Sequence, residues 1–129
     1  MTIGLIDTSI LIHLFRKHPA AEAWFTGQTV QFSVSSITWL EFMDGVPNKA
    51  GLAKCLSIVA QFELIRLTDA DQDWAMQQMA QLRLSTGVHI GDCLIASVAF
   101  RLQVPLYTQN VKDMQKVLPA ELIIRPFVA

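Results

Sequence analysis

The chain has 129 residues, of which 52% are hydrophobic and 16% are charged, with a formal net charge of −1. This length predicts a single domain, residues 1–129, that can bury a core without disulfide bonds. The near-neutral charge argues against a strong stand-alone nucleic-acid binder, which would carry a basic face. A nuclease that contacts nucleic acid only briefly remains compatible with it.

Membrane and secretory signals are weak in this sequence. The longest uncharged stretch, residues 23–40, contains two Gln and several Ser and Thr residues, so it is too polar to span a bilayer. The N-terminus lacks a cationic segment, and Asp7 interrupts its apolar run, which argues against a signal peptide. Cys55 and Cys93 have no metal-ligand spacing and predict two reduced thiols. We therefore expect a cytoplasmic protein with no membrane contact.

The first half of the chain alternates strand and helix patterns. In order, we expect a buried strand at 2–6, a helix from Thr8 that ends before Pro19, a short helix ending near Gly27, a strand at 31–35, and a helix through Glu41 that ends at Gly45.

The second half continues this alternation. We expect a helix at 50–60, a strand at 62–67, an amphipathic helix at 70–84 with Gly87 after its end, a helix from Asp92, a strand at 105–108, a short helix at 111–117 and a last strand at 122–124.

Strands that alternate with helices predict an α/β fold, a three-layer α/β/α sandwich on a mostly parallel sheet of about five strands. The high hydrophobic content has two explanations, a rich core or an additional apolar surface for a partner. In parallel sheets the ligand site lies beyond the carboxyl ends of the strands, where the strand order reverses. Asp7 and Thr108 are expected at two such ends.

Four acidic residues stand in unusually apolar segments: Asp7, Glu41, Asp92 and Asp113. A buried carboxylate needs a partner, because desolvation otherwise raises its pKa. These segments contain almost no Lys or Arg, so the economical partner is a divalent cation bound by oxygen ligands. Such a site indicates phosphodiester chemistry.

Each acid also has an ordinary structural explanation. Asp7 and Asp92 are suited to cap a helix N-terminus, and Asp113 is a typical first-turn acid of a helix capped by Asn110. Glu41 is harder to explain in this way, because its helical face also carries Ile37 and Leu40. Asp113 is the weakest candidate of the four.

Other polar clusters are poorer candidates. The run of Asp69, Asp71 and Asp73 lacks the Gly and Glu that a calcium-binding EF-hand loop requires, and it predicts a helix start instead. The three His residues share no ligand spacing, and no Ser or Cys has a base placed by a motif. Nucleophilic side-chain catalysis therefore has little support.

Four motifs in the same order resemble a known family: DTSILI, LEFMDG, GDCLIAS and TQNVKD. They resemble PIN-domain ribonucleases along the whole chain, and within these the VapC-type toxins of bacterial toxin–antitoxin modules. The resemblance implies a metal-dependent endoribonuclease with Mg²⁺ or Mn²⁺ in an acidic pocket of Asp7, Glu41, Asp92 and Asp113. Asp7 and Asp92 would bind the metal, with Glu41 and Asp113 contributing through water.

The resemblance implies further residues and partners as well. Thr8 or Ser9, and Thr108 or Asn110, would support the pocket by hydrogen bonds. The partners would be an RNA substrate, a small VapB-type antitoxin through which alone the toxin meets DNA, and a second copy in a homodimer or larger toxin–antitoxin assembly. Trp24, Phe25 and the Trp39 region are candidates for the dimer contact.

Two alternatives remain open. One is a binding module that keeps the PIN fold without catalysis. The other is a Mg²⁺-dependent phosphotransfer or phosphatase domain, which also places an Asp after a parallel strand. A phosphatase of the haloacid-dehalogenase type wants a second Asp where this chain has Ser9, and a receiver domain wants an acidic pair that is missing here.

Overall fold

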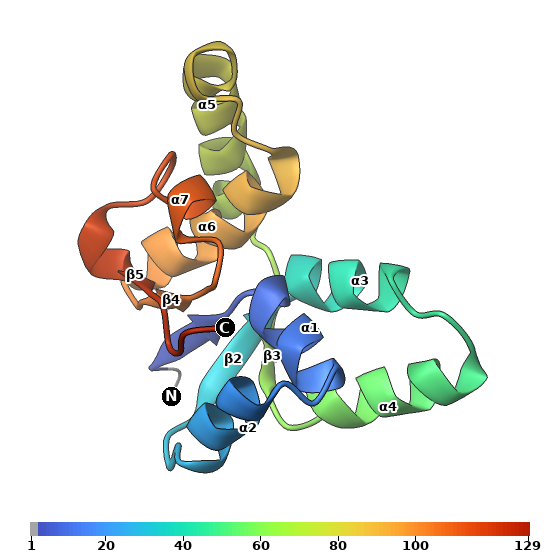
Figure 1. The fold of residues 1–129 in the computed structure, drawn as a ribbon. Helices are drawn as coiled ribbons and strands as arrows, with labels where there is room; N and C mark the ends of the chain where they lie inside the picture. The colour runs from blue at the N-terminus through green and yellow to red at the C-terminus, as the bar shows by residue number, and fades with distance from the viewer. Residues whose placement is uncertain (1–2) are drawn as a thin grey trace.

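The computed structural model describes residues 3–129, and within them five strands form one parallel sheet (Figure 1). The strand order is β3-β2-β1-β4-β5. The strands are β1 (Gly4–Ile6), β2 (Phe32–Ser35), β3 (Glu63–Ile65), β4 (Leu106–Tyr107) and β5 (Ile123–Ile124). Each lies within a segment for which the sequence predicts a strand. Thr2, the expected first residue of β1, lies outside the described residues.

Helices cover both faces of the sheet. They are α1 (Thr8–Phe15), α2 (Pro19–Thr26), α3 (Ser36–Asp44), α4 (Lys49–Val59), α5 (Asp69–Thr86), α6 (Ile90–Leu102) and α7 (Val111–Met114), with a short 3₁₀ turn at Ala120–Leu122. Successive residues of β1 point to opposite faces, so Ile6 packs with side chains of α1, α2 and α4, and Leu5 packs with those of α6 and α7. The three-layer sandwich is therefore confirmed, and every strand pair is parallel.

Some boundaries differ from the prediction. Helix α6 begins at Ile90 rather than Asp92, so Asp92 lies in the first turn and His89 occupies the N-cap position. The α-helix of α7 ends at Met114, three residues before the expected end, and continues as turns. Helix α5 agrees with the prediction. It ends directly before Gly87, which adopts the left-handed conformation with φ 71°.

The strand order places a topological switch point between β1 and β4. The chain moves from β1 to β2 and β3 on one side, then crosses the sheet through α5 and α6 to enter β4 on the other side. In sheets of this kind the ligand site lies beyond the carboxyl ends of the strands at the switch point. Asp7 and Thr108 directly follow these two strands.

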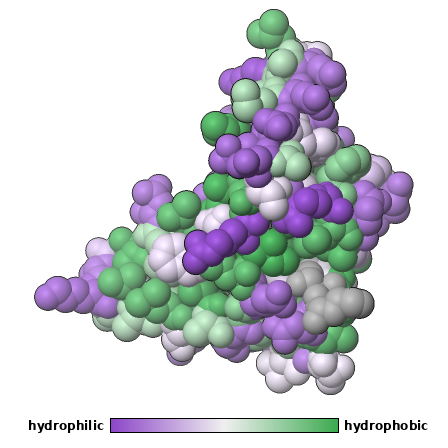
Figure 2. Space-filling view, turned by 180° about the vertical axis from the view of Figure 1, so that it is seen from behind, coloured by the Kyte–Doolittle hydropathy of each residue, from purple (hydrophilic) through white to green (hydrophobic). Residues whose placement is uncertain are grey.

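Apolar side chains are abundant both inside and on the surface. Buried clusters occupy both faces of the sheet, and Cys55 and Cys93 are free thiols within them. Leu40, Met76 and Ile90 are each more than half exposed. Figure 2 shows hydrophobic residues spread over much of the face that is turned away in Figure 1. The chain therefore has both an apolar core and exposed apolar surface. No helix within residues 3–129 is long and apolar enough to cross a bilayer.

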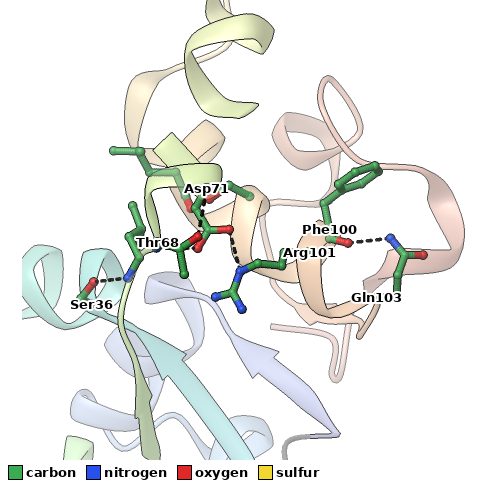
Figure 3. Close-up of polar contacts among 9 residues, drawn as sticks. Ser36, Thr68, Asp71, Phe100, Arg101 and Gln103 are labelled. Atoms are coloured by element: carbon green, nitrogen blue, oxygen red, sulfur yellow. Dashed lines mark hydrogen bonds and ion pairs between the residues drawn. The ribbon is translucent and has the colours of Figure 1, made fainter. Parts of the chain in front are cut away.

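An ion pair between the buried Asp71 and the exposed Arg101 joins α5 to α6 (Figure 3). Asp71 accepts a 2.8 Å hydrogen bond from Nε of Arg101, and its other oxygen accepts from the Thr68 amide at 3.0 Å, which closes a capping box. Burial by itself would raise the pKa of Asp71, but the hydrogen bond and charge of Arg101 and the bonds to Thr68 hold it below its usual value. The Asp-rich run is therefore a helix start, as predicted, and one of its acids anchors α5.

The substitution Asp71→Asn should lower the free energy of unfolding at pH 7 by about 1–2 kcal/mol, because it weakens the charge-assisted hydrogen bond that the buried Asp71 accepts from Arg101. The neighbouring substitution Asp73→Asn, at an exposed position, should change it by less than about 0.5 kcal/mol. A lowered folded pKa stabilises the fold above the unfolded pKa and loses that effect as the pH falls through the folded value. Urea unfolding should therefore show the Asp71→Asn deficit shrinking below about pH 4.

Candidate active site

Asp7 lies buried at the carboxyl end of β1 and is held by two hydroxyl groups. Thr108 Oγ1 donates to Asp7 Oδ2 at 2.6 Å, and Ser9 Oγ donates to the same oxygen at 2.9 Å. The register explains the first contact, because Ile6 pairs with Tyr107 and the next residues of the two strands are Asp7 and Thr108. The two hydroxyls in turn accept the backbone N–H groups of Gln109 and Asn110. This network fixes the position of the Asp7 carboxylate.

Glu41 reaches the same edge from α3. Its Oε1 accepts a 2.6 Å hydrogen bond from Thr8 Oγ1. Its Oε2 lies over Gly91, where an added Cβ would stand only 2.5 Å away. The side chain therefore bridges the N-termini of α1 and α6. Glu41 is exposed, as is Leu40 on the same helix, so the expectation that an apolar face would bury Glu41 was wrong.

Asp92 lies half-buried in the first turn of α6. It is not the helix N-cap, because α6 starts two residues earlier, at Ile90. Its carboxylate is close enough to Asp7, Glu41 and Asp113 for all three charges to act on it. Asp92 is thus the residue around which the other acids gather.

Asp113 occupies the first turn of α7, with Asn110 at the N-cap position as the sequence predicts. It forms an ion pair with Lys116 at 3.2 Å, and its side chain is 46% exposed. The backbone N–H of Asn110 donates to Thr108 Oγ1. Within residues 3–129, the Asn110 side chain forms no hydrogen bond to any of the four acids. Asp113 therefore stands at the rim of the cluster with a cation of its own.

The cluster concentrates negative charge. The pKa of Asp92 is raised to about 6 by burial and by the charges of Asp7, Asp113 and Glu41, against a smaller opposing effect of His89. Burial also raises the pKa of Asp7, although the hydrogen bonds from Thr108 and Ser9 oppose the shift. A bound cation would relieve both effects.

The donor set fits a hard divalent cation in kind, because every acid offers carboxylate oxygens. In their present conformations, no three His, Cys, Asp or Glu side chains of the described chain stand close enough together to hold one ion. Mg²⁺ usually keeps several of its waters and takes one or two direct carboxylates, so a closed cage of protein ligands is not required. Asp7, Glu41, Asp92 and Asp113 are the carboxylates that could contribute such ligands.

Two residues at the site escaped the sequence-based prediction. Gly91 has no side chain, which leaves room for the Glu41 carboxylate. Its presence in the first turn of a helix, where Gly is unfavourable, is the signal that could have identified it. His89 lies beside Asp92 and opposes the rise in the pKa of that carboxyl, and its position before α6 was missed because the helix was expected to start at Asp92.

Comparison with known proteins gives this geometry a family. The family model for the PIN domain matches residues 4–117, which is most of the chain. The chain belongs to the PIN-domain family. The four motifs that suggested this membership carry the four acids described above. The resemblance expected from the sequence is thereby confirmed.

Individual relatives agree with this membership. A protein named Ribonuclease VapC from Rickettsia bellii (strain RML369-C) is 28% identical over 134 residues, covering 95% of this chain and 96% of the relative. A toxin–antitoxin complex from Klebsiella pneumoniae contains a similar chain with a TM-score of 0.79 at 22% identity, covering 98% and 99% of the two chains. VapBC2 from Rickettsia felis, bound to a DNA fragment from its promoter, matches with a TM-score of 0.76 at 23% identity, covering 95% and 96%.

The crowding of charge at Asp92 should be visible as pH-dependent stability. Because its folded pKa is raised, charging Asp92 costs stability, a cost absent below the unfolded pKa near 4 and complete above about pH 6. In buffer without divalent cations, Asp92→Asn should raise the free energy of unfolding at pH 7.5 by on the order of 1 kcal/mol, a figure reduced because the group is only half-buried. The gain should vanish near pH 4.

The exposed Asp44, one turn along α3 from Glu41, supplies the control. Asp44→Asn should leave the unfolding free energy within about 0.5 kcal/mol of wild type at both pH values. Equal stability of Asp92→Asn and wild type at pH 7.5 would contradict the crowding argument.

Proposed function

We propose that this protein is a metal-dependent endoribonuclease, the toxin of a VapBC-type toxin–antitoxin module. The observation that carries the proposal is the convergence of Asp7, Glu41, Asp92 and Asp113 at the switch point of a PIN-family sheet. The relative named Ribonuclease VapC supports the activity. Mg²⁺ or Mn²⁺ is the proposed cofactor, because the ligands are carboxylate oxygens and their charges repel one another without a cation.

In this proposal each side chain of the site has a distinct role. Asp7 and Asp92 would hold the cation through carboxylate oxygens, and Glu41 and Asp113 would contribute through water. Ser9 and Thr108 keep the Asp7 carboxylate in one orientation, and Thr8 does the same for Glu41. When bound, the metal supplies an acidified water and stabilises charge on the phosphate oxygens.

A residue of this chain is also needed to accept the proton of the attacking water. Glu41 is the acceptor that the geometry favours. It is the most exposed of the four acids, and the hydroxyl of Thr8 fixes its Oε1. Attack by this water on the phosphorus, in line with the leaving oxygen, would break one phosphodiester bond of RNA, and the leaving oxygen would take up a proton from solvent.

A protein partner is part of the same proposal. Relatives in solved structures are named toxin–antitoxin or VapBC complexes, one of them bound to promoter DNA. An apolar groove of about 510 Å³ lies between α3, α5 and α6, lined by Ile37, Met76, Met79, Ile90 and Leu94 among others. We propose that surface of this kind receives a small VapB-type antitoxin or a second copy, and that DNA is contacted only through the antitoxin.

Fewer residues are candidates for the proposed dimer contact than the sequence suggested. Trp24 and Phe25 are half-buried and pack against the core of the α1 and α2 layer, so they are less available for a homodimer contact. Trp39 lines a surface groove with Leu40 and Leu64, and its region remains the candidate.

Cleavage of RNA tests the enzyme directly. The purified wild-type protein should cut single-stranded RNA with Mg²⁺ or Mn²⁺ and stop when EDTA is added. Asp7→Asn should reduce the rate by about a hundredfold or more, because it removes a charged ligand and leaves the fold intact. Asp44→Asn should retain the wild-type rate. Cleavage that survives both EDTA and Asp7→Asn would refute the mechanism, whereas thermal stabilisation by Mn²⁺ without turnover would favour a non-catalytic PIN module.

Expression in a bacterial host tests the toxin assignment. Wild-type protein should arrest growth in a host without the antitoxin, and Asp92→Asn should not, because it disables the acidic site. Growth curves at matched expression levels, checked by immunoblot, give the measurement. Equal growth of the two strains would count against a toxin while leaving the cleavage assay to judge the enzyme.

A further inference from the structure

A small cavity lies beside the acidic site, between α1, α3 and α4. Its volume is about 240 Å³, below the ~300–1,000 Å³ typical of pockets for drug-sized ligands. The walls are mostly apolar, and they are formed by Ile12, Phe15, Phe42, Gly45, Pro47 and Cys55. The proposed mechanism does not use this space.

Glu41 links the cavity to the acidic site. Its side chain is part of the cavity lining, while its Oε1 accepts a hydrogen bond from Thr8 and its Oε2 lies over Gly91 at the start of α6. A molecule in the cavity would therefore contact Glu41, which in the proposed function also faces the attacking water.

Positive charge borders the cavity on the side away from the acids. Arg16, exposed at the end of α1, lines it. Lys54 of α4, whose Nζ lies 4.4 Å from the centroid of the Phe15 ring, lines the neighbouring cavity together with Lys17. The acidic cluster repels phosphate, so Arg16 is suited to the next phosphate along a bound strand. The apolar walls lie between the two.

We propose that this cavity is a subsite for one nucleobase of single-stranded RNA, the base adjacent to the scissile phosphodiester, with Arg16 contacting the phosphate beyond it. The volume admits one flat ring system and is less than half that of the apolar groove offered to a protein partner. Apolar and aromatic walls with a nearby guanidinium are the surroundings that unstacked bases take in single-strand binding proteins. The inference rests on the proposed function, because it takes RNA as the ligand.

Two substitutions separate the cavity from the general charge of the protein. Gly45→Leu adds a side chain to the cavity wall, and the backbone accepts it, because φ is −87° and an added Cβ would meet only the Phe42 carbonyl oxygen at 3.8 Å. Arg16→Gln removes the bordering charge. Lys17→Gln is the matched control, because it removes the same charge one residue away, beside a different cavity.

Binding is measured with a fluorescent single-stranded RNA of mixed sequence by anisotropy, in the Asp92→Asn background with Mg²⁺, so that no cleavage occurs. Gly45→Leu and Arg16→Gln should each weaken binding about tenfold, the size of one lost base stack or phosphate contact. Lys17→Gln should change it less than about twofold. An abasic strand of equal length lacks the base that would fill the cavity. Its affinity for the parent protein should therefore be no higher than the affinity of the ordinary strand for Gly45→Leu. Thermal unfolding checks that each variant is folded.

Unchanged RNA affinity in the folded Gly45→Leu variant, or equal affinity for the abasic strand, would overturn the subsite and leave the cavity to a protein side chain. Cleavage by the wild type decides the proposed function separately. If RNA is cut while Gly45→Leu binds and cuts as the parent does, only the subsite fails. If binding depends on the cavity but no RNA is cut, the subsite stands and the nuclease fails.

Discussion

The site depends on one hydrogen bond across two parallel strands, from Thr108 Oγ1 to the buried Asp7 carboxylate. A carboxylate this deep is unfavourable without partners, and here the neighbouring strand and Ser9 supply them. The bond forms because β1 and β4 are adjacent and in register, and they are adjacent only because the chain reverses direction across the sheet at this point. Fold and site are therefore set by the same topological feature.

Charge crowding is the second constraint, and it follows from the first. With Asp7 fixed at the centre of the sheet edge, helices α3, α6 and α7 bring Glu41, Asp92 and Asp113 toward it. The fold accepts a raised pKa at Asp92 and at Asp7 in its metal-free state. Raised pKa values of this kind are typical of functional sites, where side chains are placed to bind a ligand at some cost in stability. Asp71 shows the contrast, because its buried charge meets Arg101 and its pKa falls.

Local patterns in the sequence predicted most of the fold, because each segment carries its own periodicity and end signals. Gly87 ends α5, and Asn110 precedes α7, as these residue types favour. The four acids could be grouped because strand ends meet at one edge. What local patterns could not supply were contacts between distant segments: the pairing of Asp71 with Arg101, the exposure of Glu41, and its place over Gly91. The start of α6 was missed because Ile90 and Gly91 are weak helix formers, and tertiary packing against α5 overrides that preference.

The distribution of charge also limits how RNA is engaged in the proposed function. An acidic centre repels a polyanion, and the net charge of −1 provides no long-range attraction. The cations near the site stand at its borders: Arg16 lines the cavity, Lys54 lines the neighbouring cavity, and Lys116 is already paired with Asp113. Binding energy must then come from short-range contacts, of which a bound divalent ion and an enclosed base are the two that this surface can offer. Such an enzyme selects its target by whether a strand can place an unpaired base and a phosphate together, and it discriminates through RNA shape more than through affinity for RNA in general.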